Sequence, residues 1–504
     1  MRLASCESYI INLPYQFQCG YKGFFLEPYV TSMQLSYNYT TAKLNTNVQK
    51  LPRLPVPKLS DTLAKYLQTV RPILNDEEFA RTTTLVKDFE SGSGQNLQVL
   101  LEKKAQDQLN WLEDWWLNTA YLEYRDPVVV YSSPGLVFPF RKFQSQNDQL
   151  NDKIPVEMMG KNPLDMAQYK KIFGTCRIPW EKRDKLSFNN TKHVTVIHNN
   201  HFIVGADGVT GLTYEHSPAE GQPIAVLTDF IIKYMYDFFN FYFRFIFVSF
   251  YVFVKYYILS CTSKRYNYTY FSEQNKVPEA PSASPKQPIM LKFNYGKNFI
   301  KSQKLSPDSY LQMAMQLAFY RLHKVPGAHY ESAATRMYVG GRTETIRSCS
   351  IESINFAKTM LNSQSKIKEK ISTLKSAINS HKNYTVQALQ GFGVDRHLLG
   401  LKLTAIENGI EMPKLYSDPG FTKSTHMRIS TSQVACKCDG FMCYGPLVPD
   451  GYATCYNPRD NDINFATSAF VAHPDTDCNK YRNALEQSLQ DMHDVLLQST
   501  TSKL

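Results

Sequence analysis

The stretch YEHSPAEG, residues 214–221, is the most informative segment of this 504-residue chain for its fold and its chemistry. Pro218 suits the first turn of a helix, where the missing N–H of proline costs nothing. The pattern predicts a helix start, with His216 just before it and Glu220 four residues further on the same face. A carboxylate placed there holds one ring nitrogen of histidine protonated and leaves the other free as a base for an alcohol or a thiol. The alternative is a helix-start histidine with an ordinary salt bridge.

The composition indicates a globular chain with a sizeable core. Hydrophobic residues make up 43% and charged residues 20% of the sequence, which is enough for one large two-lobed enzyme or for two or three ordinary domains. Lys and Arg number 56 against 45 Asp and Glu, a formal net charge of +11. This surplus fits an anionic ligand, and it is not gathered into the runs of five or six basic residues typical of nucleic-acid binding. We therefore expect no nucleic-acid partner.

Hydrophobic periodicity and breaker residues predict the main elements. Helical spacing runs from Ser60 to Leu117, with an interruption near residues 91–94. Further helices are expected at Ser309–Leu322, Ile351–Leu361, Ile367–Gln390 and Asp477–Leu497. Strands are expected at Val128–Tyr131, His193–His198, Met427–Thr431, Phe441–Tyr444, and at Phe202–Val204, which leads into a hairpin turn.

Four regions follow from the composition: a poorly ordered extension (1–50), a part with the histidine segment (51–236), an atypical insertion (237–290) and a well-mixed globular part (291–504). Within the insertion, twelve of the twenty residues Phe238–Tyr257 are Phe or Tyr, and residues 278–288 form a proline-rich linker. The aromatic run is open to three interpretations. These are a membrane span, a buried or mobile insertion of the protein, and non-coding DNA that was translated by error.

The chain ends in Ser502, Lys503 and Leu504, the peroxisomal address, whose alternative is a chance solvated tail. We expect import into peroxisomes by the receptor for this signal, and whether a second, mitochondrial form exists stays open. The cysteines at 436, 438, 443 and 455 match no common zinc spacing. They are expected to be structural thiols, with no metal site.

Three further groups of residues suit the recognition of an anionic nucleotide, a carboxylate and a developing oxyanion. Lys297, Lys301 and Lys304 concentrate positive charge, although alone they are a solvated cationic turn. Arg396 and scattered hydroxyl residues suit a carboxylate, which a guanidinium binds through charge-assisted bonds. The run Ser430-Thr431-Ser432 offers hydroxyls in a strand, and such groups can stabilise an oxyanion.

With these groups in this order, the sequence resembles the choline/carnitine acyltransferases over residues 51–199, 201–236 and 291–504. The resemblance implies an α/β fold of two chloramphenicol-acetyltransferase-like lobes, each a mixed sheet flanked by helices, with the active site between them. It implies reversible transfer of acetyl or other short acyl groups between coenzyme A (CoA) and carnitine by a monomer. CoA is then a co-substrate, and no cofactor is bound permanently.

The resemblance also implies a role for each matching residue. His216 is the general base, Glu220 orients it, and Ser432 donates to the oxyanion. Met442 blocks long acyl tails, or else simply fills the core. The CoA contacts are Lys297, Lys301, Lys304, Asp308, Lys382 and Gln433, where Lys382 replaces the usual arginine. The carnitine contacts are Tyr330, Ser332, Thr343, Arg396 and Ser430, and the arginine favours carnitine over choline.

The sequence departs from the family pattern in two places. Between residues 199 and 201 the family has well over a hundred further residues, so the N-terminal lobe is expected to be incomplete. After residue 236, the aromatic run and the proline-rich linker replace the usual strand and helix. The alternative function is therefore a catalytically impaired splice form, or an incorrectly assembled gene model that keeps only CoA-binding residues.

Overall fold

The computed structural model describes residues 51–123, 135–138, 156–168, 176–178, 182–187, 201–204, 210–213, 216–226, 228–229, 289–437, 440–471 and 473–501. Several predictions lie outside these residues: the order of 1–50, the strands Val128–Tyr131 and His193–His198, the aromatic run with its linker, and the C-terminal tripeptide. The division into four regions and the incomplete N-terminal lobe remain predictions.

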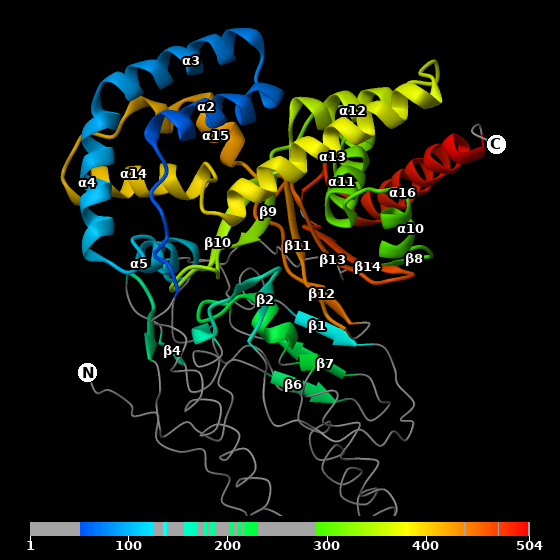
Figure 1. Cartoon of the computed structure of the whole chain (residues 1–504), viewed down its shortest axis with the longest axis horizontal. Helices are drawn as coiled ribbons and strands as arrows, with labels where there is room; N and C mark the ends of the chain where they lie inside the picture. Colours follow the sequence, from blue (N-terminus) through cyan, green and yellow to red (C-terminus); the bar gives the residue numbers. More distant parts are fainter. Residues whose placement is uncertain are drawn as a thin grey trace, which may run out of the picture.

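A six-stranded mixed sheet forms the centre of the C-terminal half (Figure 1), in the order β10-β9-β11-β13-β14-β8. Its strand β11 runs parallel to both neighbours, and the other pairs are antiparallel. The strands are β8 (Ile289–Phe293), β9 (His329–Ala334), β10 (Thr343–Arg347), β11 (Ile429–Gln433), β13 (Tyr452–Pro458) and β14 (Ile463–Ala469).

Helices pack on this sheet and enclose the largest core. Every residue of α11 from Ser309 to Phe319 is buried, because the helix lies between the sheet and its neighbouring helices. Apolar side chains from the strands and from α11, α12, α13 and α16 form one continuous cluster. The helices of this part are α10 (Lys297–Ser302), α11 (Pro307–His323), α12 (Ile351–Leu361), α13 (Ile367–Leu389) and α16 (Cys478–Thr501).

A second core is built mainly from helices and lies at the other end of the molecule (Figure 1). It joins helices from before residue 123 to α14, which comes from the C-terminal half. The predicted interruption near residues 91–94 is confirmed at Gly92, and Asn75 with Glu78 closes a capping box at the start of α3. The elements are α2 (Leu59–Val70), a 3₁₀ turn (Arg71–Ile73), α3 (Asp76–Ser91), α4 (Ser93–Asp107), α5 (Glu113–Leu117), a π-helical turn (Asn118–Leu122), α14 (Asp395–Glu407), a 3₁₀ turn (Lys414–Ser417) and α15 (Pro419–Thr425).

A smaller antiparallel sheet also joins the two halves, in the order β12-β1-β7-β6. Strand β12 comes from the C-terminal half and pairs with β1, so that Met442 lies opposite Leu136. The predicted hairpin after Phe202–Val204 is confirmed as the pair β6–β7. The strands are β1 (Gly135–Phe138), β6 (His201–Val204), β7 (Thr210–Thr213) and β12 (Phe441–Cys443), and two short pairs are β2 (Met158–Met159) with β3 (Asn162–Pro163) and β4 (Cys176–Ile178) with β5 (Lys185–Ser187).

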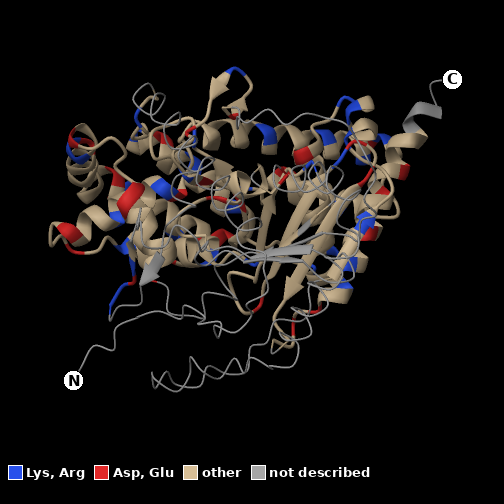
Figure 2. Ribbon diagram, turned by 90° about the horizontal axis from the view of Figure 1, so that it is seen from below, with Lys and Arg blue, Asp and Glu red and all other residues tan. Residues whose placement is uncertain are grey.

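The expected α/β class, with a mixed sheet flanked by helices, is therefore confirmed. In the view of Figure 2, Lys and Arg are interspersed with Asp and Glu over the described part of the chain. Within the part of the chain that the structure describes, no helix combines the length and apolar character needed to cross a bilayer.

Candidate active site

His216 and Glu220 lie together, but the reason differs from the predicted one. The two side chains approach at 3.6 Å, from His216 Nε2 to Glu220 Oε2. However, residues 216–219 form a bend and helical backbone begins only at Gly221, so the prediction of a helix start at Pro218 was wrong. The pair is formed by the bend rather than by one helix face, because tertiary contacts to this segment decide its shape.

Arg342, near the start of β10, supplies most of those contacts. Its guanidinium pairs with the Glu220 carboxylate and donates to the backbone carbonyls of Ser217 at 2.6 Å and His216 at 2.9 Å. Burial alone raises the pKa of Glu220, but the charges of Arg342 and His216 outweigh it and hold that pKa below its ordinary value. One arginine therefore fixes both the backbone and the charge of the histidine–carboxylate pair.

Gln168 ties the same bend to the connection between β9 and β10. Its side-chain oxygen accepts from the Glu220 amide at 2.8 Å, and its nitrogen donates to the Gly341 carbonyl at 3.0 Å. The segment 156–168 is itself fastened to this connection, where the fully buried Arg336 binds Glu157 at 2.9 Å. The bend that contains His216 is thus held by segments that are far apart in the sequence.

Tyr121 covers the imidazole. The Tyr121 and His216 rings stack at 5.2 Å between centroids and 16° between planes, and the Arg342 guanidinium lies 4.9 Å from the same tyrosine ring. Burial raises the pKa of Tyr121 far above its ordinary value, so the phenol stays neutral. The stack leaves the ring of His216 little room to rotate.

The predicted carboxylate-binding residues come together next to this pair. The Arg396 guanidinium donates hydrogen bonds to the Thr343 carbonyl at 2.9 Å, to Thr345 Oγ1 at 3.1 Å and to Thr343 Oγ1 at 3.3 Å. It lies over the Trp116 ring at 3.5 Å, a cation–π contact. Burial raises the pKa of Tyr330, which also interacts with Arg396 and Thr343. The structure therefore unites Tyr330, Thr343 and Arg396 within electrostatic range of Glu220.

Strand β11 presents Ser430 and Ser432 on one face and Thr431 on the other, as the alternation of a strand requires. Thr431 faces α11, where Gln312 donates to its hydroxyl at 3.0 Å, and Ser430 contacts the Tyr444 hydroxyl at 3.2 Å. Ser332 lies on β9 in register with Thr345. Ser432 is half-buried and Gln433 is exposed at the end of the strand.

Met442 is buried and lines a small cavity, together with Cys436, Cys455, Val434 and Ala466. This position suits both of its predicted roles, the gate and the core filler. Two of the four clustered cysteines thus line the same wall.

The predicted CoA residues divide into two groups. Lys301, Lys304 and Lys382 are exposed, and Lys297 on α10 pairs with Asp460 at 3.4 Å. Asp308, in contrast, turns inward and accepts from the Tyr456 hydroxyl at 2.6 Å. The exposed lysines are available to an anionic ligand, whereas Asp308 belongs to a buried cluster with Glu331 and His381.

Sequence reasoning missed four residues of this site: Tyr121, Trp116, Gln168 and Arg342. Arg342 stands next to the predicted Thr343, and the fact that the run Arg342-Thr343-Glu344-Thr345 places a second cation near the carboxylate site could have indicated it. Trp116 lies at the end of the predicted helical region and Tyr121 just after it. The adjacent tryptophans, Trp115 and Trp116, could have indicated that aromatic side chains gather there. Nothing in the sequence around Gln168 indicates its contacts.

A half-buried histidine paired with a carboxylate beside a hydroxyl-supported arginine suits an enzyme that activates a hydroxyl or thiol and binds a carboxylate. The family described as "Choline/Carnitine o-acyltransferase" matches residues 54–203 and 201–487 of the chain. This chain therefore belongs to the choline/carnitine O-acyltransferase family, and it is an acyltransferase.

Individual relatives agree with this assignment. The carnitine O-acetyltransferase of Columba livia is 35% identical over 90% of this chain and 95% of its own length, and that of Homo sapiens is 33% identical over 95% and 98%. The choline O-acetyltransferase of Gallus gallus is 28% identical over 90% and 93%. Among solved structures, the trichothecene 15-O-acetyltransferase TRI3 from Fusarium sporotrichioides aligns with a TM-score of 0.41 and 11% identity over 74% of this chain and 93% of its own.

Proposed function

We propose that this chain transfers acetyl and other short acyl groups reversibly between CoA and carnitine, with His216 as the general base. The observation that carries the proposal is the buried Arg396 guanidinium, held by Thr343 and Thr345 within electrostatic range of the His216–Glu220 pair. A guanidinium in that place suits the carboxylate of carnitine, whereas choline has none. The relatives named for carnitine also reach higher identity than those named for choline.

The residues divide the reaction between them. His216 takes the proton from the hydroxyl of carnitine, and the oxygen attacks the thioester carbonyl of acyl-CoA. Ser432 donates to the oxyanion of the tetrahedral intermediate. When the intermediate collapses, the C–S bond breaks and His216 returns the proton to the departing thiolate. In the reverse direction His216 deprotonates the CoA thiol, so one base serves both directions.

The fixed bend explains why a single base suffices. Arg342 binds the His216 carbonyl, Gln168 accepts from the Glu220 amide, and Tyr121 stacks on the His216 ring, so little reorientation is needed between the two proton transfers. CoA is a co-substrate in this scheme, and its phosphates meet Lys297, Lys301, Lys304 and Lys382, with Gln433 and Asp308 further along the molecule. Met442 limits the acyl tail.

The test is carnitine-dependent release of CoA from acetyl-CoA. His216→Ala should lower kcat by about 10³-fold or more, since a positioned base contributes about 10²–10⁴-fold and its removal leaves a cavity beside Tyr121. His426→Ala is the matched control, because His426 pairs with Asp450 at the surface and should leave the rate unchanged. Turnover by folded His216→Ala at the wild-type rate, or equal use of choline, would contradict the proposal.

The second candidate is the impaired splice form or mis-assembled gene model. Its support is that the family match breaks and overlaps at residues 201–203, and that the alignment with the pigeon enzyme spans 613 positions. Sequencing the transcript across residues 199–201 and 236–290 decides it. A messenger that encodes the missing block and lacks the aromatic run assigns both departures to the gene model.

We further propose that the final Ser-Lys-Leu directs the enzyme to peroxisomes through the import receptor, and that the enzyme acts as a monomer. A fluorescent fusion to the N-terminus should co-localise with a peroxisomal marker and become diffuse when Leu504 is removed. Sedimentation equilibrium measures the oligomeric state. Carbonate extraction tests a membrane-anchored form, which should remain in the pellet.

A further inference from the structure

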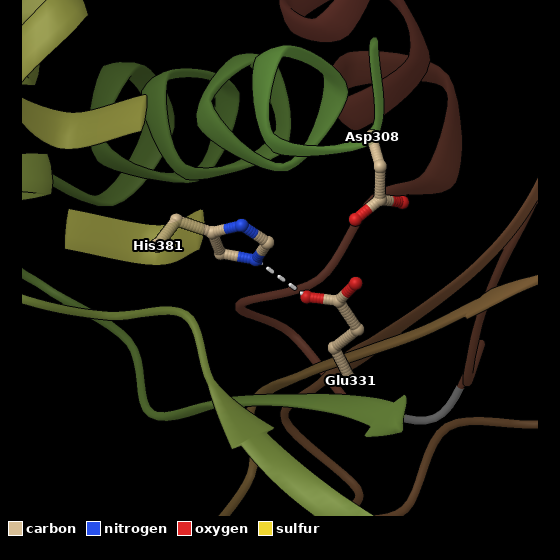
Figure 3. A group of neighbouring side chains, drawn as sticks. All are labelled: Asp308, Glu331 and His381. Carbon is tan, nitrogen blue, oxygen red and sulfur yellow. Dashed lines mark hydrogen bonds and ion pairs between the residues drawn. The ribbon is translucent and has the colours of Figure 1, made fainter. Parts of the chain in front are cut away.

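Asp308, Glu331 and His381 converge from three different elements, α11, β9 and α13 (Figure 3). Their polar atoms lie within 4.8 Å of one another. His381 Nε2 contacts Glu331 Oε2 at 2.7 Å, and the Ser348 hydroxyl donates to the same oxygen at 2.9 Å. The other ring nitrogen of His381 contacts the Ser309 hydroxyl at 2.9 Å. We call these three side chains the acid–histidine cluster.

The other titratable groups that face the cluster are neutral. Tyr456 on β13 donates to Asp308 Oδ1, and burial raises the pKa of this phenol well above its ordinary value. His329 on β9 lies near His381, and burial lowers its pKa to about 3. Of the two lysines of α10, Lys301 is exposed, and Lys297 is half-buried and pairs with Asp460. The charges of the two carboxyl groups and the imidazole are therefore compensated mainly by one another.

That balance leaves one proton to be shared between the two acids. Two carboxylates at this separation in a buried site do not both ionise freely, because like charges repel strongly there. Burial lowers the pKa of His381, but the Glu331 carboxylate more than offsets this and raises it. Burial and the neighbouring Glu331 raise the pKa of Asp308 to about 7. The cluster thus combines an imidazole whose pKa is raised with an Asp308 carboxyl that is partly protonated near neutrality.

The cluster lies where the protonation of Asp308 can affect ligand binding. Asp308 begins α11 directly after the lysine turn, and Lys382 follows His381 on α13. Tyr330 and Ser332 flank Glu331 on β9 and, by the alternation of a strand, point to the opposite face. The cluster therefore lies at the junction of the segments proposed to bind CoA and carnitine.

The contacts favour a proton rather than a metal ion at this place. Both ring nitrogens of His381 already have partners, and one Glu331 oxygen accepts two hydrogen bonds.

We propose that the acid–histidine cluster is a proton-linked positioning unit for CoA, in which a neutral Asp308 favours binding of the anionic ligand at the adjacent lysine turn. This inference rests on the proposed function, because it takes CoA as the ligand of the lysine turn. Loss of the proton places a second negative charge beside a site that receives an anionic ligand. CoA binding therefore draws the proton back when the free protein has lost it, and affinity falls as the pH rises through neutrality.

The test is isothermal titration of CoA into the wild-type protein at several pH values, each in two buffers of different ionisation enthalpy. We expect the Kd to rise roughly tenfold between pH 6.5 and 8.5, with uptake of about half a proton or more per CoA at pH 8. Asp308→Asn, which keeps a neutral group, should abolish the uptake and flatten the profile. Glu331→Gln leaves Asp308 ionised beside His381, so it should bind weakly at every pH without uptake. Asp450→Asn is the control and should behave as wild type.

A second measurement does not depend on the ligand. Infrared difference spectra of the CoA-free protein should show a protonated carboxyl band that disappears as the pH rises and that is absent in Asp308→Asn. Failure of CoA to bind at any pH contradicts the proposed function, while the infrared band still tests the shared proton. The inference is overturned if this band is absent at pH 6, if Asp308→Asn keeps the wild-type pH profile, or if Zn²⁺ or Mn²⁺ binds the wild type but not Asp308→Asn.

Discussion

The replacement of Arg342 tests the claim that one arginine aligns the catalytic base. Arg342→Lys keeps the positive charge next to Glu220, but a lysine cannot reach the carboxylate and the carbonyls of His216 and Ser217 together. Arg342→Met removes the charge as well. The two variants therefore separate the geometric effect from the electrostatic one.

The magnitudes follow from the contacts. A hydrogen bond from a charged donor contributes about 1.5–3 kcal/mol, and Arg342→Lys loses two of them, so the bend that contains His216 should relax. A shift of roughly 1 Å in a catalytic group costs about 10²-fold in rate, which is the fall in kcat that we expect, with both KM values within about threefold of wild type. Arg342→Met leaves a buried carboxylate without its main partner and should cost about 3–5 kcal/mol of stability in addition.

The pH dependence of the rate shows whether Arg342 lowers or raises the pKa of Glu220. The pKa of Glu220 lies below its ordinary value in the folded protein, since Arg342 and His216 outweigh the effect of burial. This depressed pKa contributes stability that is present above the unfolded value and is lost as the pH falls through the folded value. Arg342→Met lets burial raise the pKa of Glu220, so its acid limb of kcat/KM should move to higher pH, whereas that of Arg342→Lys should not.

The assay is initial-rate kinetics with acetyl-CoA and carnitine from pH 5 to 9, together with urea unfolding of each variant. Arg428→Lys is the matched control, because its partner Asp450 lies outside the site. If Arg342→Lys retains kcat within about twofold, Arg342 does not position the base. If it raises only the KM for carnitine, Arg342 contacts the substrate instead.

Three further predictions address substrate recognition. Arg396→Lys loses the planar fork over Trp116 and should raise the KM for carnitine about 10²-fold, with the KM for acetyl-CoA unchanged in the same assay. Met442→Ala should increase kcat/KM for octanoyl-CoA about tenfold relative to acetyl-CoA; no change in this ratio, measured by competition between the two thioesters, would leave Met442 as core filler. Lys301→Ala should raise the KM for CoA about fivefold at low ionic strength and much less at 0.5 M salt, because exposed charges are screened; an effect independent of salt would argue against a phosphate contact.

The helices could be predicted from local signals. The range Ile351–Leu361 was predicted as the structure has it, because Ser350 caps the helix and the apolar period is regular. The region 60–117 was correctly predicted to be helical, but only one of its breaks was found. The 3₁₀ turn at Arg71–Ile73 was missed, although Pro72 signals a break in a helical pattern.

The catalytic segment shows where local reasoning fails. Pro218 favours a helix start, yet the structure delays the helix to Gly221. The buried pairing of Arg342 with Glu220 and with two carbonyls of the bend outweighs this local preference. A contact between residues 122 apart leaves no trace in local periodicity. The residues of the site were assigned through the resemblance to the family, since their chemical types alone left a structural role open, whereas the elements that orient them required the structure.

The way the base is held bears on the expected gap near residue 200. The side chains that hold the His216–Glu220 bend are Tyr121, Gln168 and Arg342, and all three lie outside the region where the family pattern is interrupted. Arg342 stands on the connection that Arg336 fastens to segment 156–168, and Arg336 is completely buried. The orientation of His216 therefore depends on packing between the two halves of this chain rather than on the family residues expected between positions 199 and 201. A shortened lobe affects first how completely the substrates are enclosed, and thus their KM values, while the histidine–carboxylate pair keeps the geometry on which kcat depends.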